Sequence, residues 1–230
     1  AVSPYVADYV QRVSGVENPV IPNIVFPTAS QAAQSGNQEN AFVFSTLSYW
    51  HRLKNQKRAL KAFARVRARL PDVRYRLAGR GCGPGEDAEK WCRTNGLERG
   101  VEFVGPVGNL KAIDEIAGSG ALLHPSLEES FGMPVAEAME AGIPVAGTNQ
   151  AEGVRWLLDG GRYGHILDGY SESDMAAWME KMVKDPFFRK SKCESARARV
   201  RELCSPATVL AAFDSLYERA IEVHQHENRD

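Results

Sequence analysis

The chain has 230 residues, of which 43% are hydrophobic and 25% charged, as is typical of a globular protein with a full core. Its net charge of −1 gives no global reason to expect a nucleic-acid partner. No apolar run approaches the roughly 20 residues that span a bilayer. The four cysteines show neither a CxxC pair nor a Cys/His metal-ligand spacing, so we expect reduced thiols and no metal site.

The first forty residues differ from the rest of the chain. A short helix is predicted over 4–13 and a short strand over 19–23, followed by a stretch rich in Pro, Ser, Asn and Gln. The sequence begins with alanine rather than an initiator methionine. We therefore expect residues 1–40 to be a hinge or linker that enters the domain from a missing N-terminal domain.

Apolar strand patterns then alternate with amphipathic helical patterns. Strands are predicted over 42–48, 73–79, 101–105, 121–125, 143–147 and 164–168. Several are apolar almost throughout, which suits strands that are buried on both faces. Helices are predicted over 54–70, 85–96, 109–118 and 134–141. This order predicts an α/β fold with a doubly wound, Rossmann-like parallel sheet in a domain of residues 41–204.

The strand patterns stop after about residue 172. Three successive helices are predicted over 173–185, 186–203 and 205–225, and each of the last two begins beside a proline, which a first helical turn accepts. We interpret residues 205–230 as a separate C-terminal helix and tail.

The most informative segment is 124–148, HPSLEESFGMPVAEAMEAGIPVAGT. A loop follows its first strand, Gly132 permits close backbone approach, and Pro134 begins a helix. Such loops at the carboxyl ends of parallel strands bind ligands. The free amides from Phe131 to Met133 would lie at the positive end of the helix dipole, which suits a diphosphate.

Two acidic residues flank this turn. Glu137 is predicted in the first helical turn, where its carboxylate would accept hydrogen bonds from ribose hydroxyls, and Glu129 lies before the helix. Acidic residues near a helix N-terminus are also favourable without any ligand. The combination of both carboxylates with the glycine, the proline and the strand favours a ligand site.

Lys54 stands at the start of a predicted helix, where a cation opposes the helix dipole unless an anionic ligand is bound. Arg52 lies just before it. The alternative is that this helix simply carries a solvated basic face, formed by Lys57, Arg58, Lys61 and Arg65.

The stretch EESFGMPVAEAMEAGIPV resembles the signature of the retaining GT-B fold glycosyltransferases of family four. That signature has a Glu, seven residues and a second Glu around a glycine-containing turn. The likeness continues in VSPYVADYV…VIPN, which resembles the hinge between two domains, and in LKNQKRALKAFARVRARLPDVRYRLAGRG, which resembles the first strand–helix–strand unit. SPATVLAAFDSLYERAIE resembles the closing helix that crosses back to the other domain. The chain is thereby identified as the C-terminal, donor-binding domain of such an enzyme.

The resemblance implies a role for each matching position. Glu137 would bind the ribose, and Glu129 would face the transferred sugar as the catalytic residue. Lys54 would bind the diphosphate, and Val107 would line the base pocket. Amides of Ser130, Phe131, Gly132 and Met133 would contact sugar hydroxyls or phosphates.

The chain departs from the family pattern in its basic and acidic residues. The usual Gly-Arg pair before the lysine is absent, and either Arg52 or Arg80 would have to replace it. QAEGVRW places Arg155 where the family's Gly-Gly-x-x-Glu has its glutamate. The loop GRGCGPG (79–85) lacks GxGxxG spacing, so we interpret it as a turn lining the cleft. For His124, a buried structural role is favoured over one near the sugar.

We therefore expect a glycosyltransferase that transfers a sugar from a UDP-, GDP- or dTDP-sugar to a hydroxyl acceptor with retention. No cofactor or metal is expected, and a glycan or lipid-linked acceptor would be held by the missing domain. Alternatives are a nucleotide-sugar-binding fragment without catalysis, which we expect of this chain alone, and a sugar-nucleotide epimerase. A nicotinamide-dependent oxidoreductase would need GxGxxG after the first strand, which is absent.

The implied setting is polysaccharide biosynthesis in the cytoplasm. We expect the full-length protein to associate peripherally with the inner face of the membrane, mainly through the missing half. The base, the sugar, the acceptor and the oligomeric state do not follow from the sequence.

Overall fold

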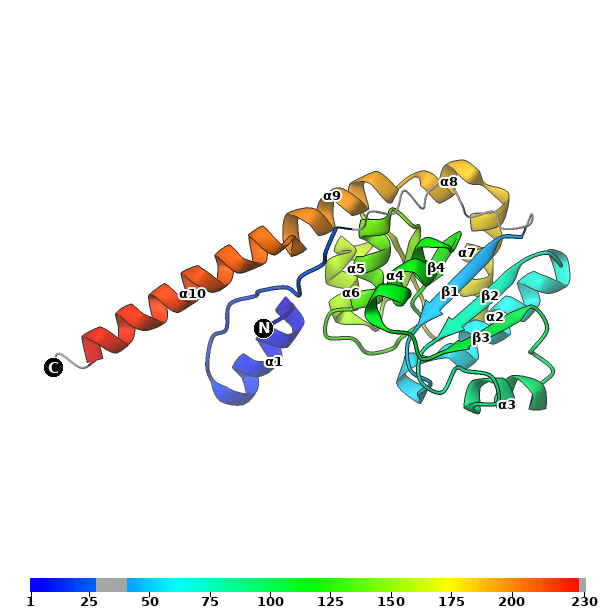
Figure 1. Cartoon of the computed structure of the whole chain (residues 1–230), viewed down its shortest axis with the longest axis horizontal. Coiled ribbons are helices and arrows are strands. Elements are labelled where there is room, and N and C mark those ends of the chain that lie inside the picture. The colour runs from blue at the N-terminus through cyan, green and yellow to red at the C-terminus, as the bar shows by residue number, and fades with distance from the viewer. Residues whose placement is uncertain (28–40, 228–230) are drawn as a thin grey trace.

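The computed structural model describes residues 1–27 and 41–227 (Figure 1). Its strands are β1 (Val43–Leu47), β2 (Arg74–Ala78), β3 (Val101–Gly105), β4 (Ala121–Leu123), β5 (Val145–Thr148) and β6 (His165–Leu167). Its helices are α1 (Pro4–Ser14), α2 (Gln56–Arg69), α3 (Asp87–Thr94), α4 (Asn109–Ala117), α5 (Met133–Ala141), α6 (Glu152–Leu157), α7 (Glu172–Lys184), α8 (Pro186–Lys190), α9 (Cys193–Cys204) and α10 (Pro206–Glu227). The described residues also contain the 3₁₀ turns η2 (Arg52–Lys54) and η3 (Asp159–Gly161).

The six strands form one parallel sheet in the order β3-β2-β1-β4-β5-β6. The chain adds β2 and then β3 on one side of β1, and then β4, β5 and β6 on the other side. The strand order therefore reverses between β1 and β4. In sheets of this kind the reversal opens a crevice beyond the carboxyl ends of the strands. The predicted doubly wound α/β fold is confirmed.

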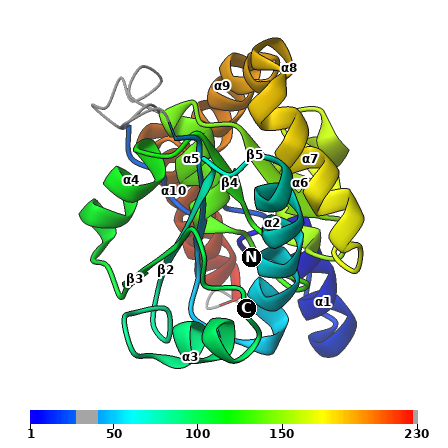
Figure 2. The same cartoon turned by 90° about the vertical axis from the view of Figure 1, so that its right-hand side faces the viewer.

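Alternate strand residues supply the two hydrophobic cores on either side of the sheet. Phe44 and Tyr75 pack with α2, α3 and α7 on one side. Leu122 and Val145 pack with α4, α5, α6 and α9 on the other. Figure 2 shows α2 and α7 on the opposite side of the sheet from α4 and α5. Burial on both faces explains why these strands are apolar almost throughout.

The predicted strand over 19–23 is wrong. Pro19 and Pro22 have no amide hydrogen to give to a sheet, and the segment has no strand in the structure. An isolated backbone hydrogen bond runs from Ile21 N to Ala1 O (2.8 Å), and another follows just after the segment, from Val25 N to Cys204 O (2.9 Å).

The single helix predicted over 186–203 is also wrong, because the structure divides it into α8 and α9. Lys192 leaves helical geometry between them, with φ −120° and ψ −4°. Its ammonium donates to the carbonyl oxygens of Gly164 (2.8 Å) and Gly161. At this break a lysine thus reaches backbone carbonyls that lie 31 and 28 positions away in the sequence.

The last helix, α10, projects away from the sheet (Figure 1). Val209 near its start is buried, whereas Leu210, Phe213, Tyr217 and Ile221 are exposed. No helix in the described part of the chain is long and apolar enough to cross a membrane. The predicted division into residues 1–40, 41–204 and 205–230 stays a prediction.

Candidate functional site

A cavity of about 340 Å³ lies beyond the carboxyl ends of β1 and β4, where the strand order reverses. It is lined by the segment after β1, the segment after β4, the start of α5 and two residues of the N-terminal segment. These are Leu47, Ser48, Tyr49 and Lys54, then His124 and Glu129 to Pro134, and finally Val2 and Asn23. The structure thus brings together six of the predicted site residues: Lys54, Glu129, Ser130, Phe131, Gly132 and Met133.

The loop from β4 to α5 is held at nearly every peptide. The side chain of Asn55 donates to Pro125 O (3.0 Å), and the Thr148 hydroxyl donates to Ser126 O. Leu127 N donates to Leu53 O (2.8 Å). Gly153 N donates to Glu129 O (3.0 Å), and Ser3 Oγ donates to Ser130 O (2.6 Å). These partners come from four different segments, so contacts within the protein define the course of the loop.

The start of α5 depends on a glycine. Gly132 has φ 97° and ψ 59°, in the left-handed region that disfavours residues with a Cβ, and a Cβ there would also collide with Val154. In the described part of the chain, no hydrogen bond reaches the amide N–H groups of Gly132 or Met133. These amides point to an anion site at the positive end of the helix.

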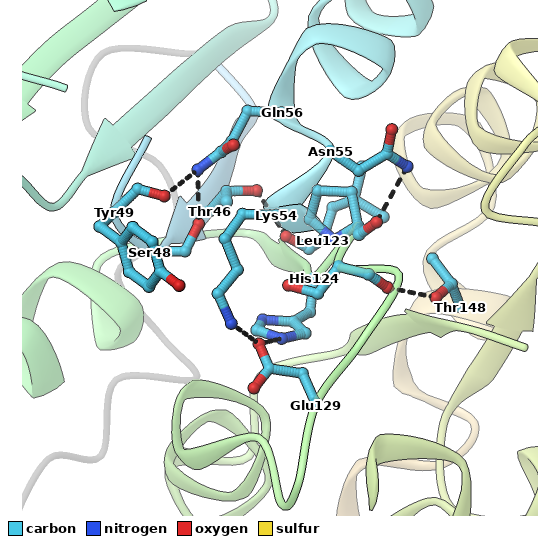
Figure 3. Close-up of polar contacts among 12 residues, drawn as sticks. Thr46, Ser48, Tyr49, Lys54, Asn55, Gln56, Leu123, His124, Glu129 and Thr148 are labelled. Atoms are coloured by element: carbon cyan, nitrogen blue, oxygen red, sulfur yellow. Dashed lines mark hydrogen bonds and ion pairs between the residues drawn. The ribbon is translucent and has the colours of Figure 1, made fainter. Parts of the chain in front are cut away.

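Lys54, Glu129 and His124 form one hydrogen-bonded group in the cavity (Figure 3). The ammonium of Lys54 lies 2.5 Å from Glu129 Oε1, and His124 Nε2 lies 2.9 Å from the same oxygen. Burial alone would raise the pKa of Glu129, but the hydrogen bonds and charges of His124 and Lys54 outweigh it and lower this pKa to about 2. Glu129 is therefore a carboxylate at neutral pH.

One further cation, Arg80, contacts the cavity through Tyr49. Tyr49 lies under two cations, with Lys54 Nζ 5.4 Å and the Arg80 guanidinium carbon 6.0 Å from its ring centre. Arg52 and Arg80 are exposed and do not line the cavity among the described residues. Val107 is half-buried against the core around α5 and lies outside the cavity lining as well.

Glu137 occupies the fifth position of α5, one residue beyond the first turn in which it was predicted, because the helix begins at Met133 and not at Pro134. It is half-buried and does not line the cavity among the described residues, and its carboxyl group makes no hydrogen bond within that part of the chain. Burial raises the pKa of Glu137 from 4.5 to about 7. Its predicted role toward a ribose stays a prediction.

The glycine-rich loop over 79–85 packs against the segment after β1. A Cβ on Gly79 would collide with Ser48 O, and one on Gly81 would lie 2.8 Å from Trp50 Cβ. Close backbone packing therefore explains these two glycines without a phosphate.

Sequence reasoning missed the residues that hold the loop: Ser3, Asn55, Thr148 and Gly153. Asn55 has φ 56°, which asparagine tolerates better than most residues, and its position just before a basic helix was a usable signal. The other three gave none, because their partners are 22 or more positions away in the sequence.

Within the described residues, no group of three or more His, Cys, Asp or Glu side chains is placed to hold a metal ion. All four cysteines are free thiols. The expectation that no metal takes part in the chemistry stays a prediction.

Comparison with known families decides the class of protein. The family described as glycosyl transferases group 1 matches residues 28–202, which is most of the chain. The chain belongs to this family. The resemblance to the GT-B glycosyltransferases, and with it the predicted family, is confirmed.

The most similar group 1 relatives include D-inositol 3-phosphate glycosyltransferases. The protein from Corynebacterium jeikeium is 29% identical over 209 residues, which are 84% of this chain and 48% of that protein. The one from Streptomyces avermitilis is 26% identical over 87% of this chain and 45% of that protein. The chain thus spans about half the length of these relatives.

Solved structures share the fold. HepE from Anabaena, in complex with UDP-glucose, has a TM-score of 0.81 at 20% identity, covering 95% of this chain and 63% of that one. Sucrose-phosphate synthase from Thermosynechococcus elongatus has a TM-score of 0.79 at 20% identity, covering 97% of this chain and 58% of that one.

Proposed function

We propose that this group 1 chain binds the nucleoside diphosphate sugar of a glycosyl transfer, with the diphosphate lying over the start of α5. The observation that carries the proposal is the meeting of Lys54 with the open amides of Gly132 and Met133 around one cavity. A lysine and a helix N-terminus both favour phosphate oxygens, and the cavity lies at the reversal of strand order.

Each group then has a task in the transfer. Lys54 and the α5 amides stabilise the negative charge that grows on the departing diphosphate. Glu129 stays ionised next to them and accepts hydrogen bonds from hydroxyls of the transferred sugar. Glu137 accepts from the ribose, Val107 adjoins the base, and Arg52 or Arg80 adds a second cation at the rim. Retention of configuration belongs to the same proposal.

The donor is proposed by analogy with neighbours of the same fold. HepE structures are named as complexes with UDP and with UDP-glucose, so UDP is the first nucleotide to test, before GDP and dTDP. The acceptor is a hydroxyl of a glycan or a lipid-linked molecule. Since the relatives are about twice as long as this chain, we assign acceptor binding to residues outside these 230.

The proposal uses only side chains and amides to neutralise the diphosphate, and therefore requires no metal. We place the enzyme in the cytoplasm, with peripheral membrane contact at the inner face. By itself the 230-residue chain binds the donor without transferring the sugar. A sugar-nucleotide epimerase would use the same donor pocket, and product analysis separates it from a transferase.

The test is a thermal-shift screen of UDP, GDP and dTDP, with a Lys54→Ala variant. We expect at least one nucleotide to raise the melting temperature of the wild type. Lys54→Ala should weaken that nucleotide's binding by roughly 10- to 100-fold, because one charge-assisted hydrogen bond is worth about 1.5–3 kcal/mol. Lys61→Ala, which removes an exposed lysine one turn into α2, is the matched control and should bind as the wild type does.

Absence of stabilisation by all three nucleotides would count against the donor site. Equal binding losses in Lys54→Ala and Lys61→Ala would show general charge attraction in place of a specific contact.

A further inference from the structure

The cation that the proposed donor site needs is already engaged. Lys54 Nζ and His124 Nε2 both approach Oε1 of Glu129, at 2.5 and 2.9 Å, and no contact to Oε2 is found in the described part of the chain. The lysine and glutamate side chains are only 14% and 16% exposed. A diphosphate that enters the cavity meets a lysine whose charge an internal carboxylate neutralises.

The two partners differ in how freely they can move. Glu129 is fixed at its backbone by the bond from Gly153 N (3.0 Å). His124 is fixed at the end of β4, with its amide 2.8 Å from Ala146 O and its side chain 2% exposed. Lys54 reaches the carboxylate on a flexible four-carbon stem from the end of η2. Of the three, Lys54 is the side chain that can swing toward a ligand.

We propose that the Lys54–Glu129 contact is a latch that a diphosphate opens, and that His124 keeps Glu129 in position after Lys54 has moved to the ligand. This proposal rests on the proposed function. His124 is thus a positioning residue, which acts through Glu129 and not on the substrate.

The buried surroundings of His124 assign its tautomer. Nδ1 is buried and has no hydrogen-bond partner in the described part of the chain. Glu129 is a carboxylate and can only accept a hydrogen bond, so Nε2 of His124 carries a proton. Nε2–H then donates to Glu129 Oε1, and Oε2 stays available for a sugar hydroxyl.

The proposed latch predicts that removal of the negative charge of Glu129 from the donor site strengthens nucleotide binding. Glu129→Gln keeps the shape of the side chain, but its neutral amide holds Lys54 more weakly and does not repel the phosphates. We expect it to bind the nucleoside diphosphate preferred by the wild type about three- to tenfold more tightly in isothermal titration calorimetry, and to bind inorganic pyrophosphate more tightly as well. Glu129→Ala should change affinity in the same direction, and circular dichroism checks that both variants fold.

Substitutions of His124 that place an amide donor at the position of either Nε2 or Nδ1 test its role. The Gln amide can stand in for Nε2, whereas the shorter Asn amide can stand in only for Nδ1. We expect His124→Gln to keep the wild-type ratio of affinities for UDP-glucose and UDP. His124→Asn and His124→Leu should shift this ratio toward UDP about fivefold or more, because Glu129 is no longer held where the sugar lies.

The possible outcomes distinguish failure of the proposed function from failure of the latch or of the His124 role. If the wild type binds no nucleoside diphosphate, the proposed function fails, and the latch fails with it. If the wild type binds and Glu129→Gln binds equally well or more weakly, the latch is overturned while the donor site stands. If His124→Asn keeps the affinity ratio as well as His124→Gln does, the positioning role is overturned.

Discussion

Among single residues, Glu137 combines an unusual ionisation with a position near the start of α5. It is half-buried, and burial raises the pKa of Glu137 from 4.5 to about 7. The native state therefore holds a proton that the unfolded chain has released between these two pH values. An ionised Glu137 accepts hydrogen bonds from hydroxyls, whereas the protonated form is also a donor. Burial thus favours the protonated side chain, whereas the proposed contact with a ribose uses the ionised one.

We predict that the free energy of unfolding falls as pH rises from about 4.5 to 7 and then levels off, because the native state binds more protons than the unfolded state over this window. Glu137→Gln removes this fall in the free energy of unfolding, because the amide does not titrate. After allowance for its partial exposure, the variant should gain about 1–2 kcal/mol over the wild type between pH 4 and pH 8. Urea unfolding at both pH values measures the difference.

Glu128→Gln provides the control, since it changes an exposed carboxyl group of the preceding loop. It should follow the wild type at both pH values. Identical pH dependence in the wild type and Glu137→Gln would show that Glu137 is ionised in the native state.

For the candidate site, the sequence predicted those residues whose place follows from the end of a strand or the start of a helix. Lys54, Glu129 and the turn at Gly132 could be assigned because strand ends and helix starts imply where free amides and charges lie. The bond between Lys54 and Glu129 could not be predicted, since it joins residues 75 positions apart. The same holds for the Asn55 tethers, which span 70 and 114 positions.

At the level of elements, the loop from β4 to α5 depends on Asn55. Its side-chain nitrogen donates to both Pro125 O (3.0 Å) and Gly169 O (2.8 Å), so that it joins the ends of β4 and β6. Asn55 is buried and has φ 56°. One residue therefore supplies two buried hydrogen bonds and the left-handed turn between η2 and α2.

Two substitutions separate these contributions. Asn55→Gly keeps the left-handed backbone but leaves two carbonyl oxygens without their donor, and should lower the free energy of unfolding by about 2–4 kcal/mol. Asn55→Ala should lose about 1 kcal/mol more, because a Cβ disfavours positive φ. Chemical denaturation measures both values. If Asn55→Gly were as stable as the wild type, the loop would be held without these bonds.

The elements themselves were predictable to different degrees. Strands buried on both faces, and helices ended by Gly118 or Gly142, follow from local pattern, and the structure confirms them. The strand expected over 19–23 did not form, because two prolines remove donors and the N-terminal segment takes its hydrogen bonds from Ala1 and Cys204. The break between α8 and α9 depends on carbonyl oxygens around η3, which no local pattern reveals.

At the level of the whole molecule, α10 carries a surface that the sheet does not cover. Leu210, Phe213, Tyr217 and Ile221 recur at helical spacing and are 54%, 38%, 62% and 56% exposed. Such a stripe on a projecting helix is typical of a surface that packs on another body. That residues 205–230 cross to a second domain stays a prediction, and a contact of that kind would cover this stripe.

We predict that this stripe contributes little to the stability of the 230-residue chain and much to its association. Replacing Phe213, Tyr217 and Ile221 with Gln should change the free energy of unfolding by less than about 1 kcal/mol, since exposed substitutions have small effects. The same triple variant should be more monomeric in sedimentation velocity at high concentration. Val209→Gln is the opposing control: Val209 is 1% exposed, and burying an amide there should cost about 2 kcal/mol or more. A triple variant destabilised as strongly as Val209→Gln would mean that the stripe packs within this chain in solution, and that α10 is part of the domain and not a bridge to another.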